Sequence, residues 1–424
     1  MMVLMLSSTE LISEESRPVI THGPFLGHLT SSSAKIWARC SKPGVYRLTA
    51  KGIGDHDALV ATTAEATLEN DMCLVWQVTG LQPGKKYFYE ATYQGHQIAG
   101  DKDNYFLTPE EVRTPTLTRL VFGSCAQEGD ESSAVWRKIS TIDPQAVVLL
   151  GDTPYIDSTE LDVQRSRYGE FASVTAFADL LHNRSFYATW DDHDFGLNDT
   201  DGRLQGKENS RRAFIEYHGN PSYGDGEEGI YTKFRRGGVE VFLLDTRYFA
   251  GTESSPFAED QTTLLGKKQW EWLRRELKAS TAPFKLLASG IIWNGAVRPN
   301  KLDHWANYPY ELEALFRFIG KENVSGVVLI GGDIHRSRVL RHETSGTAGY
   351  RISEFITSPI GSDVMDNANV PHSALIYDGG EPNAFLLITV DTTVTPPILV
   401  ADFQNATGRK LFSVRLDAKD LSLQ

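Results

Sequence analysis

The chain has 424 residues, 41% of them hydrophobic and 23% charged, which is typical of a folded protein with two or three domains. Acidic residues outnumber lysine and arginine by 55 to 42, the net charge is −13, and no basic cluster interrupts the sequence. This balance disfavours a nucleic-acid backbone or an anionic membrane surface as a partner. No run approaches the ~18 consecutive apolar residues of a membrane-spanning helix, so we expect a soluble protein.

The start of the chain and the cysteines restrict the cellular setting only weakly. Residues 1–18 open with a short apolar run but lack a basic region, so they resemble a secretion signal poorly, and the compartment stays open. The three cysteines exclude a dense disulfide framework. One bridge between Cys40 and Cys73 is possible, but both lie in apolar strand-like runs, which favours free buried thiols.

Short strands dominate the first quarter of the chain. Apolar and polar residues alternate in segments that Pro-Gly turns separate, and the turn and aromatic strand of residues 80–93 are similar to a corner of fibronectin-like domains. We therefore expect residues 17–114 to form a fibronectin-like β-sandwich that packs against or shields the rest of the protein. The strands are predicted at residues 32–40, 44–50, 73–80 and 85–93.

The pattern changes after residue 115. Apolar runs now alternate with helical stretches, which predicts a layered α/β domain over residues 115–424. The stretch 265–280 places Trp270, Leu273 and Leu277 on one helical face. The segment 200–235 starts polar and ends rich in glycine, so a lid is one interpretation. Three strands that complete a sheet are predicted at residues 384–392, 397–405 and 409–416.

Each central apolar run ends in residues that can bind a metal ion or move a proton. One such Asp is usually a cap or a turn residue. The repetition instead favours a shared site, because the carboxyl ends of strands form the ligand crevice of layered α/β sheets. The residues concerned are Cys125, Asp152, Asp191, Asp192, His193, Asp245, Asp333 and His335.

So many acids in one crevice predict bound cations, because clustered carboxylates repel one another and raise each other's pKa. The donors include carboxylates, a phenol, imidazoles and a thiol, which differ in hardness. Such a set suits an iron-like ion next to a harder divalent ion such as Ca²⁺, Mn²⁺ or Mg²⁺. Asp152 can bridge two ions through its two oxygens, and Tyr155 can fold back onto one of them.

Six motifs occur in a fixed order along the second part of the chain: FGSC (122–125), GDTPYID (151–157), WDDHDFGLND (190–199), LLDTR (243–247), KKQWEWL (267–273) and GGDIHRSR (331–338). Together they resemble the PhoD-like alkaline phosphatase and phosphodiesterase family of the calcineurin-like metallophosphatases. Residues 22–40 are also similar to the N-terminal sandwich of that family, so the likeness covers nearly the whole chain. The resemblance implies an αββα-type metallophosphatase core behind the sandwich.

The resemblance also implies a ligand set. Fe³⁺ would be held by Cys125, Asp152, Tyr155 and His335. A second ion, Ca²⁺ or else Mn²⁺, Mg²⁺ or Zn²⁺, would share Asp152 and take oxygens from Asp333 and from the loop of residues 190–199. In that loop Asp192 and Asn198 remain alternatives. Asp192 stands where the wider superfamily has an asparagine, which favours a harder ion than zinc.

The implied activity is metal-dependent hydrolysis of small phosphate esters, as a monoesterase, a diesterase or both, by in-line attack of an activated water. We expect His193 to serve as general acid or to stabilise the leaving oxygen, with Arg247 or Arg336 binding the phosphate. In the alternative interpretation His193 only orients its loop, and the two arginines form structural ion pairs.

Two other classes of function remain open at this point. Asp333 and His335 in an Asp-x-His pattern resemble part of a non-haem iron oxygenase centre, although such a centre has few acids around it. A non-catalytic, metal-bearing binding module would account for the acids if they proved structural. In each case we expect a monomer.

Overall fold

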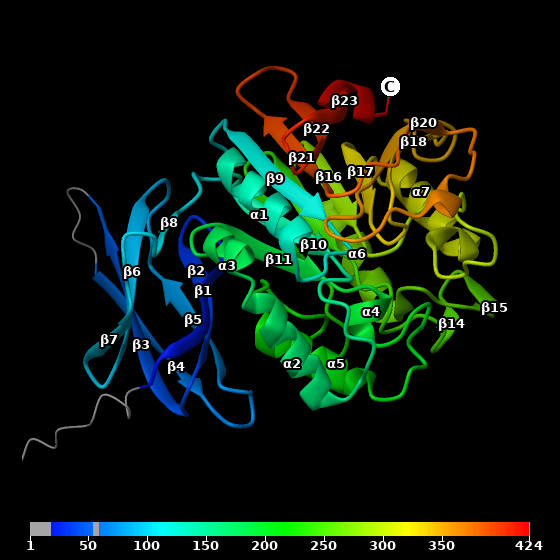
Figure 1. The fold of residues 1–424 in the computed structure, drawn as a ribbon. Helices are drawn as coiled ribbons and strands as arrows, with labels where there is room; N and C mark the ends of the chain where they lie inside the picture. Colours follow the sequence, from blue (N-terminus) through cyan, green and yellow to red (C-terminus); the bar gives the residue numbers. More distant parts are fainter. Residues whose placement is uncertain (1–17, 54–58, 424) are drawn as a thin grey trace, which may run out of the picture.

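The computed structural model describes residues 18–53 and 59–423, so the stretch considered as a secretion signal lies outside the described residues except for its last position. Figure 1 shows a β-rich N-terminal part next to a larger layered α/β body. Among the helices of the described residues, none combines the length and the apolar character that crossing a membrane requires.

The N-terminal part consists of two antiparallel sheets, as the alternating strands predict. Ile36, Tyr46 and Trp76 belong to the buried core of these strands. Cys40 and Cys73 are buried and free, as predicted, and Cys125 is buried and free as well. The first sheet has the order β1-β2-β5, with β1 (Ile20–Leu29), β2 (Ser33–Cys40) and β5 (Cys73–Thr79). The second has the order β4-β3-β6-β7 with β8 beside β6, and comprises β3 (Gly44–Gly52), β4 (Leu59–Ala66), β6 (Lys86–Tyr93), β7 (His96–Ala99) and β8 (Tyr105–Leu107).

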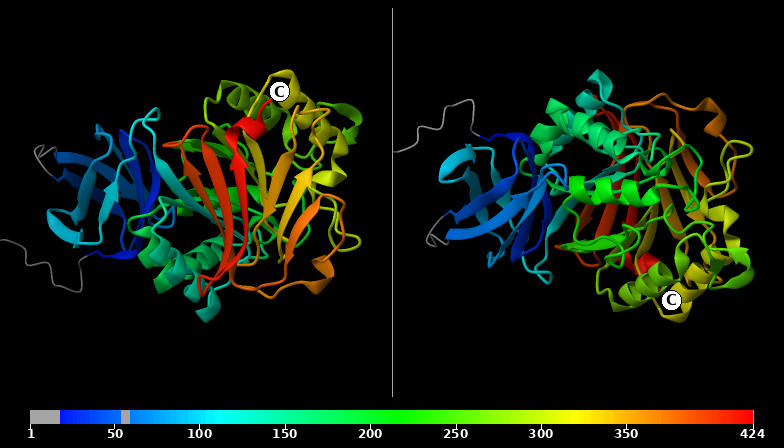
Figure 2. Two further views of the ribbon diagram at one scale, coloured as in Figure 1. Left: turned by 90° about the horizontal axis from the view of Figure 1, so that it is seen from above. Right: turned by 90° about the horizontal axis from the view of Figure 1, so that it is seen from below.

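Two larger sheets form the centre of the α/β body. The first has the order β11-β10-β9-β21-β22-β23, and the three C-terminal strands extend it, as predicted (Figure 2). Its strands are β9 (Leu117–Gly123), β10 (Ala146–Leu150), β11 (Ser185–Thr189), β21 (Ala384–Asp391), β22 (Ile398–Asn405) and β23 (Lys410–Asp417). The second has the order β12-β13-β16-β17-β19-β18-β20. Its strands are β12 (Thr232–Arg236), β13 (Val239–Leu243), β16 (Phe284–Ala288), β17 (Val327–Gly331), β18 (Ser337–His342), β19 (Ile352–Ile356) and β20 (Leu375–Gly379).

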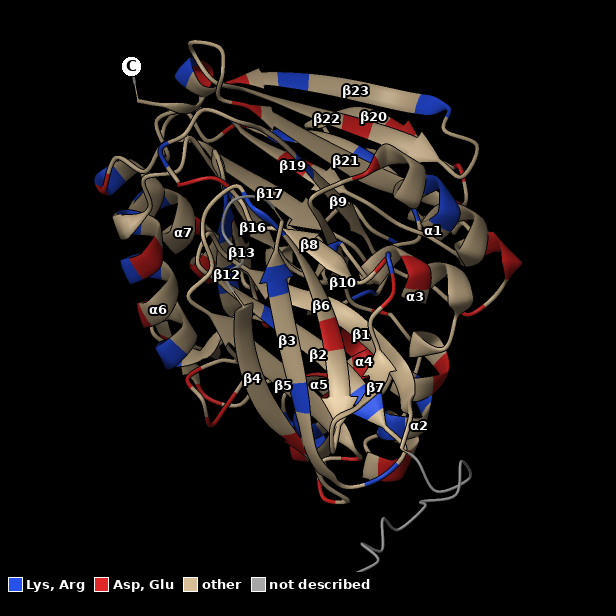
Figure 3. Ribbon diagram, turned by 90° about the vertical axis from the view of Figure 1, so that its left-hand side faces the viewer, with Lys and Arg blue, Asp and Glu red and all other residues tan. Residues whose placement is uncertain are grey.

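Helices cover the outer faces of this pair of sheets. In Figure 3, α6 and α7 lie on one side of the body, and α1, α2 and α3 lie on the other. The helices are α1 (Asp130–Ile142), α2 (Leu161–Ala172), α3 (Thr175–Leu181), α4 (Asp192–Phe195), α5 (Lys207–Tyr217), α6 (Gly266–Ala279) and α7 (Pro309–Lys321). A short hairpin, β14 (Ser254–Ser255) and β15 (Ala258–Thr262), and three 3₁₀ turns complete the fold: η2 (Trp305–Asn307), η3 (Asp366–Ala368) and η4 (Ala418–Leu421).

Apolar packing holds these layers together. Residues from both central sheets, such as Phe242, Phe355 and Phe403, lie in one buried cluster with the inner face of α6. Trp270 and Leu273 of that helix are at most 1% exposed, as predicted, and burial of such a side chain contributes about 1.5–3 kcal/mol. The segment 200–235 is no free lid, because it contains α5, which packs against α2.

Candidate metal centre

Parallel strands bring the predicted residues to one edge of the body. β9, β10 and β11 run parallel in one sheet, and β13, β16, β17 and β19 run parallel in the other. Their carboxyl ends therefore carry loops with most of the candidate ligands. Cys125 follows β9, Asp152 follows β10, Asp192 and His193 follow β11, and Asp333 and His335 follow β17.

The first group of donors contains a thiol, a carboxylate and an imidazole. Cys125, Asp152 and His335 each offer a ligand atom within 4.8 Å of the others. Cys125 Sγ lies 3.4 Å from Asp152 Oδ2. The hydroxyl of Tyr155 lies 2.8 Å from His335 Nε2, so this phenol belongs to the same group. The structure thus gathers the four residues that the sequence assigns to the first ion.

The second group consists mainly of carboxylates and shares a member with the first. Asp152, Asp192 and His193 place ligand atoms within 4.8 Å of one another, and Asp192 does so again with Asp199 and Asp303. Asn198 and Asp333 line a small cavity of about 20 Å³ together with Asp152, which has room for an occupant the size of a water molecule or an ion. The geometry brings both Asp192 and Asn198 to the centre and does not choose between them.

The backbone at this edge is strained at the ligand positions. Cys125, Asp152 and Asp333 have φ angles of 56°, 52° and 68°, and His335 has 51°. L-residues rarely adopt this left-handed region, and such strain concentrates at functional sites. Gly151 allows the close approach of two strand ends, because a Cβ there would lie 2.2 Å from the backbone nitrogen of Asp191. The short loops therefore hold each donor in a fixed direction.

Two buried carboxylates of the centre, Asp152 and Asp333, each have one oxygen without a hydrogen-bond donor among the described residues. Burial, assisted by Cys125 and Asp192, raises the pKa of Asp152 well above its usual range. Burial also raises the pKa of Asp333 to about 6, although Lys301 opposes the shift. Among the described residues, no hydrogen-bond donor reaches Asp152 Oδ1 or Asp333 Oδ2. Because such buried oxygens are costly without a partner, both fit a bound cation.

Burial also acts on the neutral donors. It raises the pKa of the Cys125 thiol to about 12 and lowers the pKa of His335. A neutral imidazole is the form that binds a metal ion, whereas the thiol must lose its proton to do so. Cation binding at this group therefore releases protons.

Lys301 and Arg298 belong to the centre, although the sequence did not single them out. Lys301 Nζ lies 3.0 Å from Asp199 Oδ1, 3.0 Å from Asp303 Oδ1 and 3.1 Å from Asp333 Oδ1, and its side chain is 3% exposed. Arg298 lines the small cavity with a side chain that is 25% exposed, and it reaches Asp199 at 3.4 Å. Both residues lie in the loop that precedes η2, outside every recognised motif.

His193 lies at the border of the cavity. Its Nδ1 is 2.6 Å from Asp157 Oδ1, and its ring packs at 4.6 Å against the ring of Tyr155. The carboxylate thus fixes one ring nitrogen and leaves Nε2 for other contacts. Asp191 is the N-cap of α4, and Asp194, three residues later, completes a capping box with it.

The two arginines expected to bind phosphate are both buried in ion pairs. Arg247 is 1% exposed and contacts Asp191 and, at 2.8 Å, Asp303. Arg336 holds Asp378 with bonds of 2.6 and 3.0 Å. Neither lines the cavity, so the geometry favours the alternative of structural ion pairs. Asp245 is also buried and accepts hydrogen bonds from Trp190 and from three backbone N–H groups.

Comparison with known proteins places the chain in a family. The family model described as PhoD-like phosphatase matches residues 120–381, which is more than half of the chain. A second model, described as a domain of unknown function (DUF7800), matches residues 17–111. Alkaline phosphatase D of Bacillus subtilis (strain 168) is 26% identical over an alignment of 310 residues, and the match covers 62% of this chain and 53% of that protein. The chain thus spans about half the length of this curated relative.

Solved structures show the same fold at low sequence identity. A structure of PhoD superposes with a TM-score of 0.73 at 19% identity, over 93% of this chain and 92% of that one. The purple acid phosphatase PPD1 from yellow lupin (Lupinus luteus) seeds gives a TM-score of 0.71 at 12% identity, over 94% of this chain and 74% of that one. These likenesses confirm the layered metallophosphatase fold. The family-model match over residues 120–381 shows that the chain, with this metallophosphatase fold, belongs to the PhoD-like phosphatase family.

Proposed function

We propose that this chain is a metal-dependent hydrolase of small phosphate esters, acting on monoesters, diesters or both. The observation that carries the proposal is the position of Asp152, whose carboxylate belongs to both donor groups. A carboxylate shared between two sets of ligands is suited to holding two neighbouring cations, which would supply positive charge at the reacting phosphoryl group. Membership of the PhoD-like phosphatase family supports the same reaction.

The two donor groups suit different ions. The thiol and the phenol favour iron as Fe³⁺ in the first group, and the oxygen donors of the second suit Ca²⁺, with Mn²⁺ or Mg²⁺ preferred over Zn²⁺. Bound there, such cations would supply positive charge to the phosphoryl oxygens and lower the pKa of water. The first ion would be held by Cys125, Asp152, Tyr155 and His335. The second would be held by Asp152, Asp333 and either Asp192 or Asn198.

Side chains of the chain itself would handle the proton and the substrate. His193 would give a proton to the leaving oxygen through Nε2, and the contact of Asp157 with the opposite ring nitrogen supports this role. Arg298 is partly exposed at the cavity, so we assign phosphate binding to it rather than to Arg247 or Arg336. Those two arginines would act as positioning residues through their paired carboxylates.

The proposal also assigns two domains to the chain and a monomeric state to the protein. Residues 17–114 would form a separate fibronectin-like domain, since their strands enclose a buried cluster of their own. Residues 115–424 would form the catalytic domain with the C-terminal strands. The protein would act as a monomer, which light scattering of the purified protein tests directly.

Metal analysis combined with two substrates tests the function. We expect about two ions per chain and chelator-sensitive hydrolysis of 4-nitrophenyl phosphate, bis(4-nitrophenyl) phosphate or both. Asp152→Asn should lower kcat/KM at least about a thousandfold, or about 4 kcal/mol of transition-state stabilisation. Asp162→Asn on the exposed face of α2 serves as the control. Less than one ion per chain, or iron-dependent oxygen uptake without ester hydrolysis, would contradict the proposal.

A further inference from the structure

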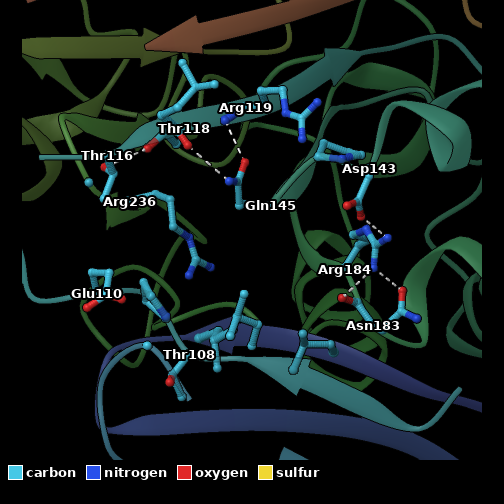
Figure 4. Close-up of a pocket in the computed structure, with 18 of the residues that line it drawn as sticks. Thr108, Glu110, Thr116, Thr118, Arg119, Asp143, Gln145, Asn183, Arg184 and Arg236 are labelled. Carbon is cyan, nitrogen blue, oxygen red and sulfur yellow. Dashed lines mark hydrogen bonds and ion pairs between the residues drawn. The ribbon is translucent and has the colours of Figure 1, made fainter. Parts of the chain in front are cut away.

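A larger cavity lies away from the metal centre, where the N-terminal sheets meet the α/β body. Its volume is about 480 Å³, which is in the range of small-molecule sites. Thr108 and Glu110 line it from the N-terminal side, whereas Thr118, Gln145 and Arg236 line it from the α/β body (Figure 4). A molecule bound there would contact both parts of the protein.

The cavity and the metal centre lie at opposite edges of the same sheets. Gln145 directly precedes β10, and Arg184 directly precedes β11, whereas the candidate ligands follow these strands. Arg236 ends β12 and pairs with Val239, the first residue of β13. A strand of five residues is about 16 Å long at ~3.3 Å per residue. The cavity is therefore a separate site, not an extension of the metal centre.

Arg236 is a buried cation without an anionic partner. Arg236 is 4% exposed, and Figure 4 shows its side chain directed into the cavity between the two walls. Nη2 donates to Ser185 Oγ at 3.1 Å, and Nε is buried with no hydrogen-bond partner in the described part of the chain. Across residues 18–53 and 59–423, no carboxylate lies within ion-pair distance of its guanidinium. Buried charges are normally paired.

Other charges around the cavity do not supply the missing anion. Four basic residues line it against two acidic ones, in a protein whose net charge is −13. Asp143 is already paired with Arg184. Burial and then the nearby charge of Arg236 lower the pKa of His28 to about 4, which is consistent with an uncompensated guanidinium. The basic residues are Lys86, Arg119, Arg184 and Arg236, and the acidic ones are Glu110 and Asp143.

We propose that this cavity binds a small oxyanion, a phosphate or carboxylate group, with the Arg236 guanidinium as its anchor. Arginine presents a planar fork of donors that matches such groups. Thr108, Thr118 and Gln145 also line the walls. The Thr108 hydroxyl already donates to Gln82 O, and the Gln145 amide already contacts Arg119 N and Leu117 O, whereas the Thr118 hydroxyl has a weaker contact, at 3.5 Å, with the hydroxyl of Thr116. Leu107 and Leu117, which are 59% and 51% exposed, give the lining an apolar portion that an organic carboxylate would contact and a free phosphate would not.

Calorimetric titration of the metal-loaded, full-length protein tests the site with two probes, inorganic phosphate and hexanoate. Hexanol serves as the uncharged counterpart of hexanoate. Arg236→Gln should weaken binding about tenfold to a hundredfold, the expected loss for a hydrogen-bonded charged group. Arg235→Gln is the matched control, because Arg235 precedes Arg236 on β12 but donates to Gly237 O at 2.7 Å and does not line the cavity. Tighter binding of hexanoate identifies an organic ligand, and tighter binding of phosphate identifies the free ion.

A second variant separates this site from the metal centre. Asp152→Asn should remove phosphate binding at the centre and leave binding at Arg236 intact, so failure of either proposal is visible without the other. If Arg236→Gln does not fold, as judged by circular dichroism, Arg119→Gln at the cavity border replaces it with an expected loss of a few fold. Equal affinities in the Arg236 and Arg235 variants, or binding of neither anion below about 10 mM, would overturn the proposal.

Discussion

Replacing Lys301 by methionine tests whether the acids of the metal centre are arranged around a cation. The ammonium group lies 3.0–3.1 Å from one oxygen each of Asp199, Asp303 and Asp333. Methionine keeps most of the apolar stem of lysine and removes only the charge. In the metal-free protein, the substitution therefore leaves buried carboxylates with one cation fewer.

The expected loss follows from this contact set. Removal of one partner from a buried ion pair costs about 3–5 kcal/mol. A bound divalent ion would take over the neutralisation of Asp333, and the remaining loss would be that of an ordinary hydrogen bond, about 1 kcal/mol. The free energy of unfolding of Lys301→Met should therefore fall by about 2–4 kcal/mol more without metal than with it.

Urea unfolding of the chelated and the metal-loaded proteins measures this difference. Lys285→Met is the matched control, because Lys285 is 3% exposed but donates to the backbone oxygens of Ala282 and Ser325 at 2.7 and 2.9 Å. The loss in free energy of unfolding that Lys285→Met causes should be the same with and without metal. If Lys301→Met loses the same stability in both conditions, the acids do not share a cation with this lysine, and the electrostatic reasoning for the centre fails.

Three further substitutions test other parts of the structure. Cys125→Ser should lower the iron content at least about tenfold and leave the second ion in place, because the thiol of Cys125 belongs to one donor group only. Elemental analysis of the variant measures both ions. Glu311→Gln should cost about 3 kcal/mol or more in urea unfolding, since this buried carboxylate accepts five hydrogen bonds, whereas exposed Glu313→Gln should cost little. Burial lowers the pKa of His218 to about 4. Between pH ~6.5 and 4, His218 is therefore protonated in the unfolded chain but mostly neutral in the folded chain. The contribution of His218 to the free energy of unfolding should therefore fall by about 3 kcal/mol as the pH drops from ~6.5 to 4, and His218→Gln should remove that part of the slope.

The layered body was predictable because its central strands are buried on both faces. Continuous apolar runs such as residues 146–150 are typical of such strands, and all five of these residues are at most 1% exposed. The convergence of Asp152 and Asp333 followed from the rule that parallel strands present their carboxyl ends at one edge. The structure places both residues there.

Strands without this signal escaped prediction. β1 carries Gly23-Pro24 and Gly27, which break the alternation, and Gly27 allows close approach of the backbone at Gly219. β4 is half exposed and rich in Ala and Thr, so it lacks a clear apolar face. Their pairing with distant strands determines their conformation, and local sequence does not encode that pairing.

Side-chain direction limited the prediction of the site. Arg247 and Arg336 each follow a candidate ligand closely in sequence, yet their guanidinium groups turn to other carboxylates, the buried Asp191 and the half-buried Asp378. Lys301 and Arg298 reach the cavity from a loop with no motif, more than thirty residues before Asp333. Spacing along the chain fixes which strand end a residue occupies, but the packing of neighbouring loops decides where its charged group lies.

The two edges of the central sheets carry charged groups of opposite sign, and the buried strands between them keep these groups apart. Carboxylates collect where β10 and β11 end, and basic residues collect where these strands begin. The strand β10 that separates them is almost wholly excluded from solvent, so its apolar residues keep the two sets of charges apart in a poorly screened interior. Each set therefore needs its own counter-charge, which bound cations would supply at one edge and an oxyanion would supply at the other.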